Sequence, residues 1–493
     1  MQILSTARRR REAIPAAVAL AHWLTTFATE RLVLEVAPTA HFLNYLLCKL
    51  LLLAALFGFW RLLWRALLDP ERRASQERRT LCCALPYLAV LVLWMLLVRP
   101  YALVADERNL YERAIRLDSY AYWFNYLSGF YWITCLMAVP HYLGPVLIKM
   151  LLQALICGYC VSRQVKQSGK WGLLLYLLFL LPLTLDLGVS AHRLPTYGMA
   201  YLFFAAKLYY DWRDGKRLTA PELVWLSALV GVLAFWRSEG IYLTVLGAIL
   251  ICVAYRVRRA DGLWKKLAVY ALTLVLVFLP QLQAYADSEA GLSLRTKPLC
   301  GYLICNMFRN GLTEADVADE RADIEAYLKF DTIKDYNERL GDENYYQAYV
   351  MDGVEKADYA AQERFCAAVK RVVLHHPLVY LRAQCGAFGY VHRQYPVSLS
   401  GLGAAVKSAV HVTYWPSIPT IFVLGACLYG LLRRRWLVFW LAGGGLANFA
   451  IVFLLMPAAY VKYFYVDFLL GWFFLLVGVI ALLRRRSNAK KTA

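Results

Sequence analysis

The sequence predicts an all-α, polytopic membrane protein with about twelve transmembrane helices. Hydrophobic residues make up 60% of the 493 positions and charged residues only 18%, and the mean hydropathy is +0.46, far from the average of soluble domains. Many apolar runs reach the roughly 18 to 20 residues that a bilayer crossing requires. The net charge of +20 is carried by Arg and Lys at the ends of these runs, so it indicates membrane topology and not nucleic-acid binding.

Residues 1–80 are predicted to form a basic cytoplasmic segment and a helical hairpin. A basic block at Arg8–Arg11 precedes an apolar stretch at Ile14–Ala28, and a second apolar run at His41–Trp60 is followed by further arginines. Both basic blocks belong on the cytoplasmic side, so two crossings lie between them. The first charged and apolar stretch also fits the layout of a signal peptide, and the sequence leaves that alternative open.

Residues 81–280 are predicted to form a transmembrane core, and residues 413–493 a set of C-terminal transmembrane helices with a basic cytoplasmic tail. The apolar runs behind these predictions are Leu81–Val98, Leu143–Val161, Trp171–Leu187, Leu194–Tyr210, Leu223–Trp236, Gly240–Tyr255, Leu267–Pro280, Thr413–Leu432, Trp436–Met456 and Tyr460–Leu483. The basic loops between them all fall on one side, as the positive-inside rule requires. We therefore expect a multi-pass protein of the cell membrane with both termini in the cytoplasm.

The same alternation places two longer segments on the outer face. The first is the acidic loop 99–128. The clustered aromatic residues Tyr120–Trp132, which begin in this loop, are typical of an interface belt, and stacking on a sugar is the alternative. The second is the extracytoplasmic helical region, residues 281–412, which is rich in Asp and Glu. Its periodicity predicts a helix at Ala357–Leu374 with Phe365 on the apolar face. Pro377 should end that helix at the two histidines before it.

The acidic loop carries the candidate catalytic residues, Asp106 and Glu107. A carboxylate can remove a proton from an acceptor hydroxyl if it lies within hydrogen-bond reach. Asp106 is the first candidate for such a base and Glu107 the second. Adjacent residues of a helical turn point in different directions, so both cannot easily serve one acceptor. Asp118, further along the loop, could orient an acceptor or share a metal. The alternative is that these charges form a solvated helix face.

Cations on the outer face are the candidate binding residues for a phosphate, because the guanidinium fork matches phosphate oxygens. The very short outer loops 190–196 and 237–239 hold His192, Arg193, Arg237 and Glu239 close to the bilayer surface, and Lys462 lies in another outer loop. Ionisable groups at that depth are costly and tend to be functional or paired. Arg237 and Glu239 could equally form a mutual ion pair, and Lys462 could be an interfacial anchor.

Lysines within or near the ends of apolar runs, such as Lys149, have a simpler interpretation. A lysine at such a position can extend its amine to the membrane surface. The sequence contains no GxGxxG or Walker-type phosphate loop, which argues against direct use of a cytoplasmic nucleotide.

The layout resembles the GT-C superfamily, the polyprenyl-phosphate-sugar-dependent membrane glycosyltransferases related to protein O-mannosyltransferases and aminoarabinose transferases. The resemblance covers roughly Leu81–Leu483 and includes an acidic residue in the first outer loop, at Asp106 or Glu107. The segments Trp236–Gly240 and His375–Leu381 are also similar to junctions in bacterial members. The N-terminal hairpin departs from the family, in which the acidic loop follows the first span.

The resemblance implies an inverting glycosyltransferase. It would transfer a sugar from a polyprenyl-phosphate donor to a glycan, lipid or protein acceptor at the outer face. Its expected partners are this donor, the acceptor and membrane lipids, and no nucleic acid. Some relatives use a divalent cation, and the short acidic motif leaves that requirement open. Two other functions remain: a transporter or flippase of a lipid-linked glycan or other amphipathic substrate, and a lipid-glycan ligase or polymerase. A transporter should place ionisable groups near the middle of several spans, whereas the charges here gather at span ends on one side.

Overall fold

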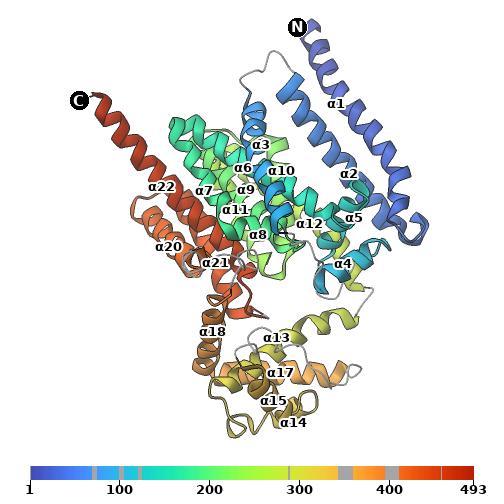
Figure 1. Cartoon of the computed structure of the whole chain (residues 1–493), viewed down its shortest axis with the longest axis vertical. Coiled ribbons are helices and arrows are strands. Elements are labelled where there is room, and N and C mark those ends of the chain that lie inside the picture. The colour runs from blue at the N-terminus through green and yellow to red at the C-terminus, as the bar shows by residue number, and fades with distance from the viewer. Residues whose placement is uncertain are drawn as a thin grey trace.

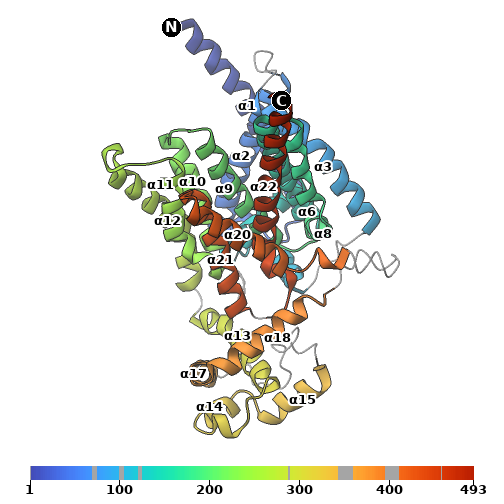
Figure 2. The same ribbon diagram turned by 90° about the vertical axis from the view of Figure 1, so that its left-hand side faces the viewer.

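The computed structural model describes residues 2–68, 75–98, 105–119, 125–286, 289–341, 359–394, 410–456 and 458–492. Within these ranges every regular element is a helix, which confirms the predicted all-α class. Both chain ends lie at one end of the molecule, and a separate group of helices lies at the opposite end (Figures 1 and 2). We call this second group, residues 289–394 as far as they are described, the distal region.

The helices outside the distal region form one bundle with an N-terminal hairpin beside it (Figure 1). They are α1 (Gln2–Thr29), α2 (Phe42–Leu63), α3 (Gln76–Val98), α4 (Ala105–Ala114), α5 (Tyr126–Ala138), α6 (Gly144–Ser168), α7 (Tyr176–Leu180), α8 (Pro182–Val189), α9 (Leu194–Arg213), α10 (Ala220–Trp236), α11 (Leu243–Ala254), α12 (Leu263–Ala286), α20 (Ser417–Leu432), α21 (Trp436–Leu455) and α22 (Tyr465–Thr492). The distal region comprises α13 (Glu289–Arg309), α14 (Arg321–Glu325), α15 (Phe330–Leu340), α17 (Tyr359–His375) and α18 (Pro377–Val391).

Six helical stretches of the described chain are long and apolar enough to cross a membrane. They are Pro38–Leu67, Gln76–Leu97, Gly144–Leu180, Leu263–Leu282, Trp436–Leu455 and Val461–Ala489. Shorter apolar helices lie at Tyr126–Ala138, Ala220–Trp236, Ser238–Ala254 and Ser417–Leu432. The chain is thus helical with several membrane-length segments, and the larger count of about twelve spans stays a prediction.

The predicted span Trp171–Leu187 is wrong as a single helix. The structure divides it into a 3-10 turn at Gly169–Leu175, the short helix α7 and the short helix α8. The break falls at Leu181, whose φ of −59° and ψ of 135° are not helical. Its successor, Pro182, explains the break, because a proline pushes the preceding residue out of the helical region.

Of the described aromatic residues predicted as an interface belt, Tyr126, Phe130 and Trp132 are buried and Tyr131 is half-buried. Phe130 is 5% exposed and Trp132 is 0% exposed, and both pack in the core between the N-terminal hairpin, α4 and α5. Residues 120–124 of the predicted belt lie outside the described residues. An aromatic-rich run lies at the membrane interface only when its helix faces lipid. Helix α5 is instead covered by the N-terminal hairpin, so the prediction of an interface belt is wrong for these residues.

The N-terminal hairpin braces the helix that carries the acidic pair. Helices α1 and α2 lie side by side (Figure 1) and enclose a buried ion pair between Lys49 and Glu30. The turn between them donates the backbone N–H of Glu35 to the carbonyl of Ile115 at 2.8 Å. The Asn44 amide donates to the carbonyl of Leu117 at 3.0 Å. Both carbonyls lie just past α4, so the hairpin fixes the C-terminal end of that helix.

Small residues allow the helices of the bundle to approach closely. A Cβ atom on Gly158 of α6 would lie 2.3 Å from the Thr80 carbonyl oxygen of α3. A Cβ atom on Gly198 of α9 would lie 2.6 Å from the Tyr465 ring of α22. Glycines at such crossings are typical of membrane helix pairs, which gain their stability from tight packing.

The distal region has its own hydrophobic core. The predicted helix Ala357–Leu374 is confirmed over its described part as α17, with Phe365 fully buried. The helix ends at His375, and α18 begins at Pro377 as the proline rule predicted. The core also includes Phe464, from the connector that joins α21 to α22, so the distal region is packed directly onto the bundle.

Candidate functional site

Helix α4 presents the two acidic residues of its first turn to different environments. Asp106, in its first turn, is exposed, whereas the side chain of Glu107 is only 2% exposed. The Oε2 atom of Glu107 has no hydrogen-bond partner among the described residues. A buried carboxylate oxygen without a partner is expensive, so this atom marks a place where a ligand or substrate group could bind.

Glu107 faces His192, in the turn between α8 and α9. The Nδ1 atom of His192 lies 3.3 Å from Oε1 of Glu107. Burial raises the pKa of the Glu107 carboxyl, but the contact with His192 and the charges of Lys462 and Arg193 together outweigh burial and lower the pKa to about 2. Burial also lowers the pKa of His192 below 6.5. At pH 7 the pair is therefore an ionised carboxylate beside a neutral imidazole.

A buried lysine holds the turn that carries His192. Lys149, on α6, is 3% exposed, and its amine donates to the carbonyl oxygens of Leu187 at 2.9 Å and His192 at 3.1 Å. It also donates to the carbonyl of Ser190. The amine thus caps the C-terminal end of α8 and fixes the backbone from which His192 projects.

Arg193 follows in the same turn and points toward α5. Its Nη1 atom donates to Oγ of Ser128 at 3.1 Å. Burial and the charge of Arg237 together lower the pKa of Arg193 to about 10, although Asp106 and Glu107 act in the opposite direction. The guanidinium remains charged at pH 7 and lies within electrostatic range of both carboxylates.

Arg237 and Glu239 form the ion pair that the sequence left as one alternative. The Nε atom of Arg237 donates to Oε2 of Glu239 at 3.1 Å, and Nη2 donates to Oε1. The Arg237 guanidinium also lies over two aromatic rings, 5.9 Å from the centroid of Tyr197 and 5.3 Å from that of Tyr463. This geometry orients the guanidinium, and the two-pronged pair with Glu239 balances its charge.

Lys462 completes the cluster from the 3-10 turn η11 (Val461–Phe464). Its amine lies 4.6 Å from the ring centroid of Tyr460 and 5.9 Å from that of Tyr463. It is attracted by Glu107 and Asp106 and repelled by the two arginines. An interfacial anchor alone would not interact with four charged residues from three other segments.

The structure therefore brings together residues that are far apart in the sequence. We define the cation cluster as Arg193, Arg237 and Lys462, and the acidic pair as Asp106 and Glu107. The members come from α4, the α8–α9 turn, the α10–η6 junction and η11, and each cation interacts with other members of these two groups. With Glu239, which pairs with Arg237, three cations face three carboxylates. An additional anion would therefore be bound by direct contacts with the cations and not by a net positive charge.

Asp118 lies at a different place in the loop. Its carboxylate pairs with Nη1 of Arg113 at 2.7 Å, beyond the C-terminal end of α4. This ion pair gives Asp118 a role in closing the loop, and we do not include it in the site.

A divalent cation does not fit the donor set. Among the residues that the structure describes, no three His, Cys, Asp or Glu side chains gather as metal ligands. The two carboxylates of the acidic pair already face protein cations. Hard divalent ions require several oxygen ligands, so we derive no reaction step through a metal.

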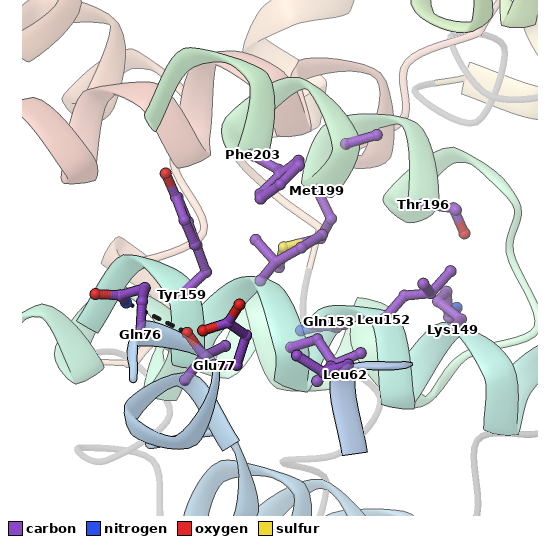
Figure 3. Close-up of a pocket in the computed structure, with 14 residues that line it drawn as sticks. Leu62, Gln76, Glu77, Lys149, Leu152, Gln153, Tyr159, Thr196, Met199 and Phe203 are labelled. Carbon is purple, nitrogen blue, oxygen red and sulfur yellow. Dashed lines mark hydrogen bonds between the residues drawn. The ribbon is translucent and has the colours of Figure 1, made fainter. Parts of the chain in front are cut away.

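An apolar cavity of about 510 Å³ lies between α3, α6 and α9, and Leu62 of α2 also lines it. Lys149 and Thr196 lie at one end of it, and Gln76, Glu77 and Tyr159 lie at the other (Figure 3). Its walls between these ends are mainly aliphatic and aromatic. Because Lys149 also binds the carbonyl of His192, the Lys149 end of the cavity adjoins the turn that carries two residues of the site.

Some residues of the site were not predicted from the sequence. Lys149 was interpreted as extending to the membrane surface, but the structure shows its amine buried against backbone carbonyls. Ser128 and Tyr463, which contact Arg193 and Arg237, gave no signal. A lysine several residues inside an apolar run, where it is costly without partners, was the one signal that could have been used.

Comparisons with known proteins give no identification. No protein-family model, no curated protein and no solved structure matches this chain. The class of the protein is therefore argued from its helices and its site alone.

Proposed function

We propose that this chain is a GT-C-like membrane glycosyltransferase that transfers a sugar from a polyprenyl-phosphate donor to an acceptor. The observation that supports the proposal most directly is the meeting of two features. One is a buried carboxylate, Glu107, which interacts with Arg193 and Lys462 of the cation cluster. The other is the apolar cavity, which reaches Lys149 directly below the His192 turn. A lipid-linked phosphosugar has the complementary parts, an apolar chain and an anionic head.

The cavity suits an isoprenoid chain. Its volume falls within the range of about 300–1,000 Å³ that ligand pockets occupy and its lining is apolar. Burial of apolar chain there would contribute roughly 25 cal/mol per Å² removed from water. Such a chain would enter beside α6 and α9 and leave the phosphate at the end marked by Thr196 (Figure 3).

The cation cluster would bind the phosphate. Arginine matches phosphate oxygens in two-pronged fashion and lysine acts as a point charge. Arg193 is fixed by Ser128, and Arg237 is fixed by Glu239 and two tyrosine rings. Preorganised cations stabilise the negative charge that develops on the leaving phosphate.

In this mechanism Asp106 removes the proton of the acceptor hydroxyl. It is exposed, so an acceptor can reach it, and it lies within electrostatic range of Arg193 and Lys462. The acceptor oxygen then attacks the anomeric carbon, and the carbon–oxygen bond to the phosphate breaks, so that polyprenyl phosphate leaves with the electron pair. A single displacement of this kind inverts the anomeric centre.

Glu107 is better suited to positioning than to proton removal. A carboxylate whose pKa is about 2 is a weak base at pH 7. It is also almost fully buried. Its role in the proposal is to hold His192 and to balance the positive charge of Arg193 and Lys462.

For the membrane topology we propose a cell-membrane protein with both termini in the cytoplasm and the site at the outer face. The termini lie at the end opposite the distal region (Figure 1). The basic tail residues Arg484–Arg486 lie at the terminal end, as the positive-inside rule requires for that side.

One observation favours a flippase as the second candidate. Asp467 of α22 is completely buried, and its Oδ1 atom has no hydrogen-bond partner within the described chain. Its Oδ2 atom accepts a hydrogen bond from Asn448 of α21 at 3.1 Å. Ionisable groups inside spans commonly mark transport pathways.

The test uses the purified full-length protein in vesicles that contain a panel of polyprenyl-phosphate sugars. The proposal predicts release of polyprenyl phosphate and a glycosylated product with at least one donor when glycan, lipid and protein acceptors are supplied. Movement of donor across the bilayer without product, abolished by Asp467→Asn, would support the flippase instead. Neither transfer nor movement with any donor would contradict both.

A further inference from the structure

The cation cluster is connected to the distal region by one short connector, residues 458–464 between α21 and α22. The connector carries Lys462 and Tyr463, the residue whose ring lies under the Arg237 guanidinium. Its backbone includes the 3-10 turn η11, which by itself makes only local hydrogen bonds and is a weak support. Something outside the connector has to fix it.

Gln394, just past the end of α18, binds this connector with both halves of its amide. Its Oε1 atom accepts a hydrogen bond from the backbone N–H of Val461 at 3.1 Å. Its Nε2 atom donates to the backbone carbonyl of Ala459. The two bonds enclose the backbone directly before Lys462, so a single side chain sets where η11 begins.

The rest of α18 secures Gln394 to the bundle. Phe388 packs edge-on against Phe464, with the ring centroids 5.1 Å apart. Gln384 donates to the carbonyl of Leu454 at 2.7 Å, at the end of α21. Gln384 thus attaches the distal region to the bundle without touching the connector, which makes it a natural comparison for Gln394.

The opposite side of the connector faces the site. The Lys462 amine is attracted by Glu107 and Asp106, and the Tyr463 ring lies 5.3 Å from the Arg237 guanidinium carbon. A shift of the backbone at Val461 would therefore displace one cation and the aromatic support of another. A misplacement of about 1 Å is enough to weaken a preorganised site substantially.

We propose that Gln394 is a positioning residue: it fixes the connector so that Lys462 and Tyr463 stand beside Arg237, and through it the distal region controls how tightly the site binds an anionic lipid phosphate. The ligand class rests on the proposed function. The placement of Lys462 by Gln394 is independent of the proposed function.

The test compares Gln394→Met with Gln384→Met in the full-length protein. Methionine keeps nearly the length of glutamine but lacks both hydrogen-bonding groups of the amide. The first measurement needs no ligand: the rate at which a small acylating reagent modifies the Lys462 amine, followed by peptide mass spectrometry. We expect about a tenfold change in Gln394→Met, as the loss of two hydrogen bonds allows, and no change in Gln384→Met. Equal Lys462 rates in wild type and Gln394→Met would overturn the positioning role.

The second measurement is binding of farnesyl phosphate in vesicles, with farnesol as the uncharged comparison. We expect Gln394→Met to weaken binding of farnesyl phosphate about tenfold and to leave farnesol binding unchanged, while thermal unfolding shows that both variants are folded. Equal phosphate affinity in wild type and Gln394→Met would contradict control of the site by the distal region. If wild type binds no farnesyl phosphate while the Lys462 rate still changes, the proposed function fails and the positioning role stands.

Discussion

The Oε1 atom of Glu107 lies 3.3 Å from the Nδ1 atom of His192. This contact joins α4, which carries the acidic pair, to the turn between α8 and α9, which carries Arg193. The other carboxylate oxygen of Glu107 has no hydrogen-bond partner among the described residues. One oxygen of the Glu107 carboxylate therefore joins the two segments of the site, and the other oxygen is available to a ligand.

Removal of the Arg193 guanidinium should weaken donor binding. Arg193→Gln loses a charge-assisted phosphate contact, which is typically worth about 1.5–3 kcal/mol, so we expect the KM for a polyprenyl-phosphate sugar to rise at least about tenfold. The KM of Arg193→Lys should lie between those of wild type and Arg193→Gln, because lysine keeps the charge but lacks the two-pronged guanidinium. Steady-state kinetics measure both. Arg116→Gln is the control, since Arg116 is 66% exposed and pairs with Glu35; an equal rise in KM there would contradict a specific role for Arg193.

The stability of the protein should depend on Glu107 at acidic pH. The pKa of Glu107 is lowered from 4.5 to about 2, so its contribution is fully present above pH 4.5 and is lost as the pH falls toward 2. The shift corresponds to about 3 kcal/mol. Glu107→Gln should lower the thermal midpoint in detergent at pH 6 and flatten its decline between pH 4.5 and the acid limit of the measurement. Glu112→Gln, at an exposed position of the same helix, should behave like wild type. A Glu107→Gln curve parallel to wild type over this range would argue against the lowered pKa.

The crossing of α3 and α6 should not tolerate a side chain at Gly158. A Cβ atom there would lie 2.3 Å from the carbonyl oxygen of Thr80, so the helices must separate. We expect Gly158→Ala to lower the free energy of unfolding by about 1–3 kcal/mol. Gly425→Ala is the matched control, because a Cβ atom on Gly425 of α20 meets nothing within 4 Å. Thermal unfolding in detergent compares the two, and equal stability of both variants would show that the crossing is looser than described.

Labelling from outside intact cells should report the proposed topology. Asp335 of α15 is 64% exposed. Arg434, between α20 and α21, is also exposed, in a basic loop that the positive-inside rule assigns to the cytoplasmic side. With the exposed native cysteines Cys82 and Cys385 replaced by serine, a membrane-impermeant maleimide should label Asp335→Cys and not Arg434→Cys. The reverse pattern would place the distal region, and with it the site, on the cytoplasmic side.

The sequence was informative about the class of the chain and about single helix ends. The length of the apolar runs was enough to predict the all-α class with membrane-length helices. The position of Pro377 was enough to predict the end of α17. Both features depend on local chemistry. The same local rule, applied to Pro182, would have divided the span predicted at Trp171–Leu187. The aromatic run of α5 was misplaced since its burial depends on the hairpin packing over it, which no local pattern reports.

The site, too, could be predicted where it depends on local sequence and not where it depends on tertiary contacts. Asp106, Glu107, Arg193, Arg237 and Lys462 were selected for residue type and loop position, and the structure places them together. Which neighbour each of them contacts could not be predicted, because Ser128, Lys149 and Gln394 act through tertiary hydrogen bonds across more than 30 residues of chain. Roles that depend on burial, such as that of Glu107, became visible only in three dimensions.

The most direct test of the central claim is sugar transfer by Asp106→Asn, measured with purified protein, a polyprenyl-phosphate sugar donor and an acceptor in vesicles. Asparagine keeps the shape of the side chain and removes its basicity. We expect kcat to fall at least about a hundredfold, the range of general-base catalysis, and donor binding to be retained because the cation cluster is intact. Glu107→Gln should lose transfer as well, through the disturbed His192 turn. Full transfer activity in both variants would contradict the assignment of the acidic pair as the catalytic end of a membrane glycosyltransferase.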